Sequence, residues 1–343
     1  MGVKTELWGK IGQTDIRRFW LESGALRAAV LTYGATLQAL EYAGRDCVLG
    51  YDTLEGYLSG GSYQGAAVGR YANRIADGRF TLNGTTYDVG RNENGVGHLH
   101  GGQAGFDKRV WQAEVLDDGD QPAVRLSRVS PDGEEGYPGN LAVSLTYRIV
   151  GGDTLQLSYT AQSDRDTVVN LTNHAYFNLN GQDGGDVLGT QLQIFADAFT
   201  PVDARLIPTG ELRPVQGTPF DFRQPKAIGR DIAAQDEQLR LGQGYDHNFV
   251  LGMDRSRRHA VCAYSPESGI RLDCFTDMPG IQVYTANVLD EPGGKGRRPL
   301  QKRHAFCLET QFFPDSPNQP SFPSPVLRAG ETYASVTEYR FSR

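Results

Sequence analysis

Every second side chain from residue 141 to residue 149 is apolar, with Ser144, Thr146 and Arg148 among those between, and no other feature of the sequence constrains the fold as much. The apolar positions are Leu141, Val143, Leu145, Tyr147 and Ile149. A period of two is that of a β-strand with one face in a core and the other in water. Residues 151–153 (Gly-Gly-Asp) then form a turn, and Leu155, Leu157 and Tyr159 resume the alternation. The sequence therefore predicts an antiparallel hairpin here.

A second hairpin is predicted around the Asn83-Gly84 pair. Apolar residues alternate on both sides of the pair, at Phe80, Leu82, Tyr87 and Val89. Asn and Gly tolerate the positive φ angles that a two-residue type I′ turn requires. Because the two arms of a hairpin return to the same end, we expect residues 70–74 before it to approach residues 98–102 after it.

The composition favours many turns and short strands over long helices. Glycine occupies 42 of the 343 positions, against an average usage of roughly 7%, and the chain has 17 prolines. Only residues 228–241 offer a short helical stretch. We find no repeat of fixed period, low-complexity tract or interdomain linker. We therefore expect an all-β protein in which residues 1–343 form one domain.

The charge and the cysteines exclude several classes of partner and location. The formal net charge is -7, so no global positive field draws the chain onto nucleic acid or an anionic membrane. The N-terminal region contains no apolar run long enough for a signal peptide or a membrane span. The four cysteines are far apart and form no CxxC pair: Cys47, Cys262, Cys274 and Cys307. We therefore expect a reducing compartment, the cytoplasm, and a neutral small-molecule partner.

The most informative segment for function runs from residue 168 to residue 179 and reads as one strand. Its apolar face holds Val169, Leu171, Ala175, Phe177 and Leu179. Its other face holds Asn170, Thr172, His174, Tyr176 and Asn178. A solvated strand face normally favours Lys, Glu and Thr, whereas these amides and the histidine suit hydrogen bonds to neutral hydroxyls. We therefore expect His174 to be functional rather than only exposed.

Two histidines two residues apart, His98 and His100, would share one face of an extended segment. Gly101 and Gly102 follow them and would allow a ligand to approach the backbone. No third and fourth ligand follows at a zinc-like spacing, so we do not expect a metal site. His100 is either a buried structural histidine or a substrate-binding residue.

A carboxylate lies on the polar side of an otherwise apolar strand near the C-terminus. Phe306 and Leu308 alternate with Cys307, Glu309 and Gln311. Burying a carboxylate is costly, so Glu309 is expected either to form an ion pair, with Arg74 as one candidate partner, or to have a catalytic role. Cys307 reads as a core residue rather than a nucleophile. Asp246 and Gln282 each stand beside aromatic residues, which completes a set of groups typical of carbohydrate sites.

One local basic stretch, residues 295–303, contains Lys295, Arg297, Arg298, Lys302 and Arg303. Glycines and a proline surround it, so we interpret it as a solvated loop. A phosphate-binding role is the alternative. The sequence has no Walker or GxGxxG motif that would hold a phosphate elsewhere.

The sequence closely resembles the aldose 1-epimerase (galactose mutarotase) family over nearly its whole length. Five ordered motifs carry the resemblance: GRYANRI at 69–75, HLHGG at 98–102, NLTNH at 170–174 with YFNL at 176–179, YDH at 245–247, and FCLETQ at 306–311. Two further blocks, 199–222 and 313–318, are also similar to the family. Five motifs in the same order are hard to obtain by chance.

The resemblance implies a large antiparallel β-sandwich with very little helix and an open sugar cleft. It also implies a reaction in which His174 is the general acid and Glu309 the general base. The substrate-positioning residues carried over from the family are Asn73, Arg74, His100, Asp246 and Gln282. The implied substrate is a free aldose such as galactose or glucose, bound by a monomer or homodimer. No metal and no cofactor are implied.

Three other functions remain open from the sequence. A glycosidase would use Glu309 and Asp246 as its carboxylate pair, which leaves His174 without a role. A sugar-phosphate epimerase would hold the phosphate with the basic stretch at 295–303. A sugar-binding module would keep the cleft without the reaction, but the presence of both His174 and Glu309 argues against it.

Overall fold

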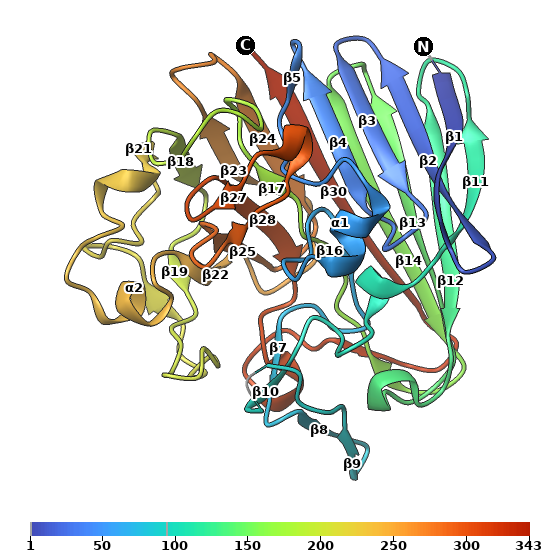
Figure 1. The fold of residues 1–343 in the computed structure, drawn as a ribbon. Coiled ribbons are helices and arrows are strands. Elements are labelled where there is room, and N and C mark those ends of the chain that lie inside the picture. The colour runs from blue at the N-terminus through green and yellow to red at the C-terminus, as the bar shows by residue number, and fades with distance from the viewer. Residues whose placement is uncertain (1, 94) are drawn as a thin grey trace.

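The computed structural model describes residues 2–93 and 95–343 and contains many short antiparallel strands (Figure 1). Strands hold 45% of the residues and helices 8%, which confirms the all-β prediction. None of the helices in this part of the chain is long and apolar enough to cross a membrane. The two α-helices are α1 (Leu54–Ser59) and α2 (Glu237–Leu241).

The largest sheet has nine strands and contains the first predicted hairpin. Its strands are, in spatial order, β11 (Gln112–Asp117), β12 (Ala123–Ser130), β13 (Leu141–Val150), β14 (Thr154–Ser163), β30 (Thr332–Ser342), β24 (Arg271–Thr276), β23 (Arg258–Tyr264), β18 (Gln191–Ile194) and β21 (Lys226–Ala227). Leu145 of β13 pairs with Tyr159 of β14, as the alternation predicted. The alternating residues of β13 are buried on one face, so this sheet presents an apolar surface to a partner layer.

Two smaller sheets form that partner layer. The first contains β1 (Gly2–Ile11), β2 (Thr14–Ser23), β3 (Leu26–Leu31), β4 (Leu37–Tyr42) and β5 (Arg45–Asp46). The second contains β17 (Tyr176–Phe177), β28 (Phe306–Gln311), β25 (Gly280–Tyr284), β22 (Asp246–Val250), β19 (Ala198–Phe199) and β20 (Arg213–Pro214). In Figure 1 the blue strands β2–β4 lie over the green strands β12–β14. One hydrophobic cluster joins the layers and runs from Phe19 to Phe341, which makes the fold a β-sandwich.

Five two-stranded ribbons complete the fold. They pair β6 (Ala67–Val68) with β16 (Thr172–Asn173), β7 (Arg74–Ala76) with β10 (Gly97–Leu99), β8 (Arg79–Leu82) with β9 (Thr85–Asp88), β15 (Thr167–Val168) with β29 (Val326–Leu327), and β26 (Asp290–Glu291) with β27 (Leu300–Gln301). The β8–β9 ribbon is the predicted Asn-Gly hairpin, with φ angles of 51° at Asn83 and 78° at Gly84. Because β7 pairs with β10, residues 70–74 do meet residues 98–102.

The prediction of a single strand over residues 168–179 is wrong. The segment has three different partners in succession, since β15 pairs with β29, β16 with β6, and β17 with β28. Its polar side chains therefore do not form one wall. The Asn170 amide bonds to the backbone of Ala72 and Phe312 inside the protein, and the Asn178 amide bonds to backbone carbonyls as well.

The helical stretch expected over residues 228–241 forms only at its two ends. A 3₁₀ turn covers Ile228–Arg230, and α2 begins at Glu237. The break has a local cause, because the Asp236 carboxylate accepts hydrogen bonds from the backbone N–H groups of Gln238 and Leu239. This N-cap fixes the start of α2 and separates it from the residues before.

Candidate active site

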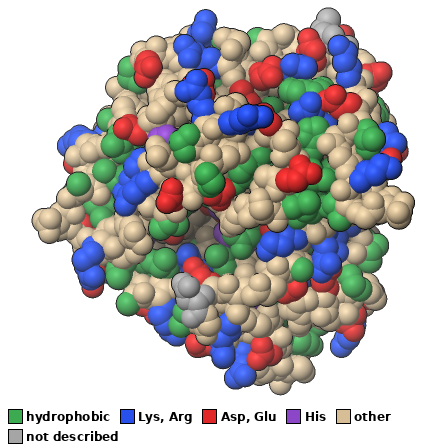
Figure 2. All heavy atoms as spheres, viewed as in Figure 1, with side chains coloured by type: hydrophobic (Ala, Val, Ile, Leu, Met, Phe, Trp, Pro, Cys, Tyr) green, Lys and Arg blue, Asp and Glu red, His purple; other side chains and the backbone are tan. Residues whose placement is uncertain are grey.

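A cleft of about 380 Å³ opens beside the six-stranded sheet, and a hollow is visible near the centre of the face shown in Figure 2. Six of the seven predicted site residues line it: Asn73, Arg74, His100, His174, Asp246 and Glu309. The seventh, Gln282, lies directly behind Asp246 and donates a hydrogen bond of 2.7 Å to its carboxylate. The structure thus brings together side chains that are up to 236 residues apart, from Asn73 to Glu309.

Strand register explains why the residues of the cleft floor meet. One row of paired residues crosses β17, β28, β25 and β22: Tyr176, Cys307, Tyr284 and Asp246. The next row crosses three of these strands: Glu309, Gln282 and Asn248. Side chains two apart along a strand share a face, so both rows point the same way. The alternation that singled out Glu309 in the sequence therefore reflects its true position.

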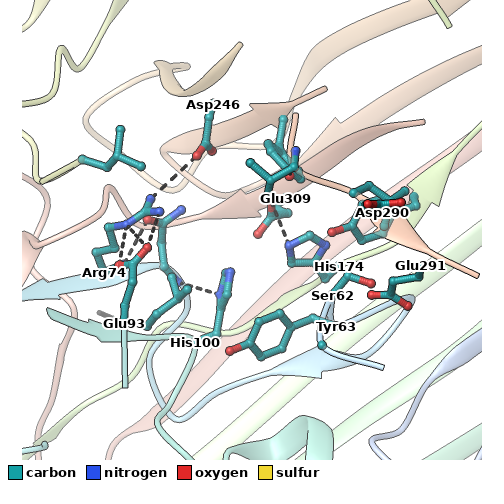
Figure 3. A pocket seen from close by; sticks show the side chains of 18 residues that line it. Ser62, Tyr63, Arg74, Glu93, His100, His174, Asp246, Asp290, Glu291 and Glu309 are labelled. Atoms are coloured by element: carbon teal, nitrogen blue, oxygen red, sulfur yellow. Dashed lines mark hydrogen bonds and ion pairs between the residues drawn. The ribbon is translucent and has the colours of Figure 1, made fainter. Parts of the chain in front are cut away.

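His174 and Glu309 face each other at the bottom of the cleft (Figure 3). The distance from His174 Nε2 to Glu309 Oε1 is 3.7 Å, and both side chains are buried. Glu309 Oε2 has no hydrogen-bond partner among the described residues. The ion pair between Glu309 and Arg74 that the sequence left open is not formed. A buried carboxyl oxygen without a partner is costly, and such groups are typical of catalytic and ligand-binding sites.

Burial shifts the pKa values of both His174 and Glu309 in the direction that favours the neutral form of each side chain. Burial, together with the nearby charge of Asp246, raises the pKa of Glu309 well above its ordinary value. Burial lowers the pKa of His174 to about 4. Both shifts favour a protonated Glu309 beside a neutral imidazole, and in that form the pair holds one exchangeable proton, on Glu309. An imidazolium facing a carboxylate would hold the same number of protons.

The Asp246 carboxylate contacts Gln282 and Arg74 rather than His174. It accepts from Gln282, and one oxygen lies 3.9 Å from Arg74 Nη1. The only ion-pair partner of His174 among the described residues is Glu309. Asp246 acts on the pair indirectly, through its effect on the pKa of Glu309.

Arg74 is held in the cleft wall by a residue that the sequence did not single out. Its guanidinium donates to both oxygens of Glu93, at 2.7 to 3.1 Å. The Asn73 side chain in turn accepts from the backbone N–H of Arg74 at 2.9 Å. The bidentate contact with Glu93 fixes the plane of the Arg74 guanidinium and neutralises its charge. Glu93 lies in a loop, at an isolated β-bridge with Gly97, where no periodic pattern marks a residue as functional.

His100 is oriented as a hydrogen-bond donor toward the cleft. The backbone N–H of Asn73 donates to His100 Nδ1 at 3.1 Å, so the proton of the neutral ring is on Nε2. The closest ligand atoms of His100, His174 and Glu309 all lie within 4.8 Å of one another. A metal bound at His100 Nε2 would require a proton on Nδ1, facing another N–H group. The hydrogen bond thus disfavours a metal at these three residues.

His98, the other histidine of the HLHGG motif, has a structural role. His98 is fully buried, and its Nε2 lies 2.7 Å from the Tyr137 hydroxyl. It does not line the cleft. Of the two histidines considered together in the sequence, only His100 faces the candidate active site.

Aromatic side chains surround His174. Tyr176 and Tyr63 stack on the imidazole, with ring centroids at 4.9 and 5.9 Å and interplanar angles of 20° in both cases. Tyr284 approaches its edge at 6.4 Å. Tyr63 adopts a φ of 57° in the loop after α1, and the sequence did not mark it. Aromatic faces of this kind pack against the apolar faces of sugar rings.

The far end of the cleft is acidic, and the basic stretch does not reach it. Figure 3 shows Ser62, Asp290 and Glu291 on the side of His174 opposite Arg74. No residue of 295–303 lines the cleft. The expectation of a solvated loop is wrong for Lys295, which is buried and pairs with Asp46 at 2.6 Å. Arg298 pairs with Asp183.

Comparison with known proteins gives one consistent result. The sequence profile of the family named aldose 1-epimerase matches residues 17–340. Galactose mutarotase from Bos taurus is 46% identical, with 97% of this chain and 96% of that protein covered. Aldose 1-epimerase from Escherichia coli K12 is 39% identical, with 91% of each chain covered. The crystal structure of a galactose 1-epimerase from Lactobacillus acidophilus superposes with a TM-score of 0.89, at 28% identity over 99% of this chain and 98% of that one.

Proposed function

Because the chain belongs to the aldose 1-epimerase family and is a mutarotase, we propose that His174 and Glu309 interconvert the two anomers of its sugar substrate by proton transfer. The observation that carries this proposal is the buried Glu309 carboxyl, which has an unpartnered oxygen and lies 3.7 Å from His174 Nε2. The substrate is a small-molecule aldose, and we propose that galactose and glucose are both accepted.

The reaction begins with a redistribution of the single proton that the pair shares. The hydroxyls of a bound sugar hydrogen-bond to the Glu309 carboxylate and favour its charged form, and the proton then resides on His174. Glu309 removes the proton of the C1 hydroxyl while His174 protonates the ring oxygen. The bond between C1 and the ring oxygen breaks, and an open-chain aldehyde forms.

Ring closure reverses these transfers on the other face of the carbonyl. Rotation about the C1–C2 bond presents that face to the returning oxygen. His174 takes the proton back from the C5 hydroxyl, and Glu309 returns a proton to the carbonyl oxygen. The enzyme ends with the proton count with which it began, so no redox cofactor or metal is needed for any step. Each positioned carrier contributes on the order of 10²- to 10⁴-fold in rate.

The other residues position the sugar. His100 Nε2–H donates to a sugar oxygen, since its Nδ1 already accepts from Asn73. The Arg74 guanidinium, oriented by Glu93, and the Asp246 carboxylate, oriented by Gln282, bind hydroxyls on the same side of the cleft. Asn73 fixes the backbone from which Arg74 projects. This arrangement keeps the reacting atoms beside His174 and Glu309.

The pH dependence of the reaction tests the shared proton. Below about pH 4 His174 takes up a second proton, Glu309 stays protonated and the pair has no base. Above the raised pKa of Glu309 the pair loses its only proton and has no acid. Between these limits kcat/KM stays level. We expect no decline near pH 6.5, where an ordinary histidine loses its proton. Polarimetry with freshly dissolved α-glucose at each pH measures this, and a loss of activity centred on pH 6.5 contradicts the shared-proton state.

The charge of the cleft tests the choice between free sugars and sugar phosphates. Five carboxyl groups line it, in Glu93, Asp246, Asp290, Glu291 and Glu309. Arg74, already paired with Glu93, is the one Lys or Arg among the described lining residues. A phosphate would meet uncompensated negative charge, at a cost on the order of 1 kcal/mol or more for each close carboxylate. We expect kcat/KM for glucose 6-phosphate to be at least about tenfold below that for glucose. Equal or higher values for the phosphate would favour a sugar-phosphate epimerase.

We also propose that residues 1–343 act as one domain, as a monomer or homodimer in the cytoplasm, without nucleic-acid or membrane partners. The hydrophobic cluster that runs from Phe19 to Phe341 supports a single domain. The four cysteines are buried and free, which suits a reducing compartment. The net charge of -7 supports the absence of polyanionic partners.

A further inference from the structure

Cys307 lies against the nitrogen of His174 that the reaction does not use. Its Sγ is 3.6 Å from His174 Nδ1, while His174 Nε2 faces Glu309. Cys307 occupies the same row of the cleft floor as Tyr176 and Tyr284, and it is fully buried. The thiol therefore contacts the catalytic ring and is shielded from solvent.

Aromatic stacking alone does not determine which of its two flipped orientations the His174 imidazole adopts. Tyr176 and Tyr63 lie nearly parallel to the ring, so they fix its plane. They do not distinguish the ring from its flipped form, in which carbons and nitrogens exchange places. A hydrogen-bonding group at the ring edge makes that distinction, because only a nitrogen can donate to it or accept from it. Cys307 is located at this edge.

The neighbour of Nδ1 has to suit two protonation states. When the imidazolium protonates the ring oxygen it gives up its Nε2 proton, so neutral His174 keeps its proton on Nδ1 and leaves Nε2 free for the proton of Glu309. Nδ1 therefore carries a proton in both states and requires an acceptor. The sulfur of a thiol is a weak acceptor, so it serves both states. A carboxylate at this position would instead stabilise the imidazolium and hold back the proton that His174 must release.

Resting on the proposed roles of His174 and Glu309, we propose that Cys307 is a positioning residue for the reaction. Its sulfur accepts from Nδ1–H of neutral His174 and so keeps the Nε2 lone pair directed toward Glu309, where it takes up the shared proton. The same contact holds Nδ1–H when the imidazolium forms. The direction of the Cys307 pKa agrees with this role, since burial and the charges of Glu309 and Asp246 raise it well above its ordinary value. The group therefore remains a thiol and is not a nucleophile.

The wild-type protein tests the first half of the proposal by itself. Nitrogen-15 labelling of histidine gives each ring a tautomer-specific pair of shifts, and the His174 signals are assigned by their loss in His174→Asn. At pH 7, without sugar, we expect neutral His174 with its proton on Nδ1. A dominant Nε2–H tautomer would overturn the proposal, whatever the variants show.

Variants at position 307 test the effect on catalysis. We expect Cys307→Ala to lower kcat by about tenfold at unchanged KM, as for the loss of one hydrogen bond, and to give a mixture of His174 tautomers. Cys307→Ser supplies a hydroxyl that also donates and accepts, and we expect it to recover kcat to within about threefold of wild type. Thermal unfolding of both variants checks that the fold is retained.

Two outcomes would overturn the role of Cys307. One is wild-type kcat with an unchanged tautomer in Cys307→Ala. The other is a loss of kcat that Cys307→Ser does not restore, because that pattern indicates packing alone. Failure of the proposed function is recognised separately, since it would appear as full activity in Glu309→Gln or His174→Asn.

Discussion

Replacing Glu309 with Gln lowers kcat by about 10²- to 10⁴-fold, the range expected for the loss of one positioned proton carrier. Glutamine has the shape of the protonated carboxyl that burial favours at this position, but it cannot remove the proton from the C1 hydroxyl. KM changes little, because the groups that position the sugar remain. Polarimetry with freshly dissolved α-galactose gives both constants.

The stability of this variant separates a catalytic effect from misfolding. The pKa of Glu309 is raised in the folded state. Such a group costs stability at pH values above its unfolded pKa, and a neutral amide removes that cost. We therefore expect Glu309→Gln to unfold at the same temperature as wild type or above it. Glu291→Gln is the matched control, since it removes another carboxyl from the cleft, and its kcat should fall by no more than about threefold. Near-wild-type kcat in folded Glu309→Gln would remove Glu309 from its role.

Replacing His174 with Asn produces a loss of similar size. Asparagine can still donate a hydrogen bond, but it cannot protonate the ring oxygen at neutral pH, and we expect kcat to fall by about 10²- to 10⁴-fold. The stacking of Tyr176 and Tyr63 on the ring is lost as well, so thermal unfolding is measured in parallel. A folded His174→Asn enzyme with kcat within about threefold of wild type is incompatible with the proposed general acid.

His100→Asn provides the matched contrast for His174→Asn. Both histidines line the cleft, with ring centroids 5.2 Å apart. His100 only donates to the sugar in our account, so its loss weakens ground-state binding and raises KM more than it lowers kcat. A kcat loss in His100→Asn equal to that in His174→Asn would indicate that the two roles are not separate.

Much of the fold was predictable because strand periodicity depends on local sequence. The β13–β14 hairpin and the Asn83-Gly84 hairpin both formed where alternation and turn residues predicted them. The second hairpin also explains why Arg74 and Leu99 pair. Glu309 was identified by the same reasoning, since a carboxylate on an apolar strand is unusual wherever that strand lies.

The structure of residues 168–179 could not be predicted from local sequence alone. Its alternation predicted one strand, but the tertiary fold gives it three partners in succession. Two of its polar residues, Asn170 and Asn178, satisfy buried backbone groups instead of facing a sugar. His174 and Tyr176, which the alternation placed on one face, nevertheless both line the cleft.

Residues recruited from loops were not predictable. Glu93 and Tyr63 lie in loops, and their contacts with Arg74 and His174 depend on how distant segments pack. The protonation state of the His174–Glu309 pair could likewise not be predicted from the sequence. The implied roles of general acid and general base correspond to a charged histidine and a charged glutamate, whereas burial favours the neutral form of each. Only the closed environment of the cleft determines that the two residues share one proton.

The central claim is that His174 and Glu309 act as one unit around that proton, and the double variant Glu309→Gln with His174→Asn tests it most directly. When two groups act together in one step, the first substitution removes nearly the whole effect. We predict that kcat of the double variant, measured by polarimetry with α-galactose, lies within about tenfold of the slower single variant. Losses that multiply, with the double variant slower by the product of the two single effects, would show that the residues act independently and contradict the account.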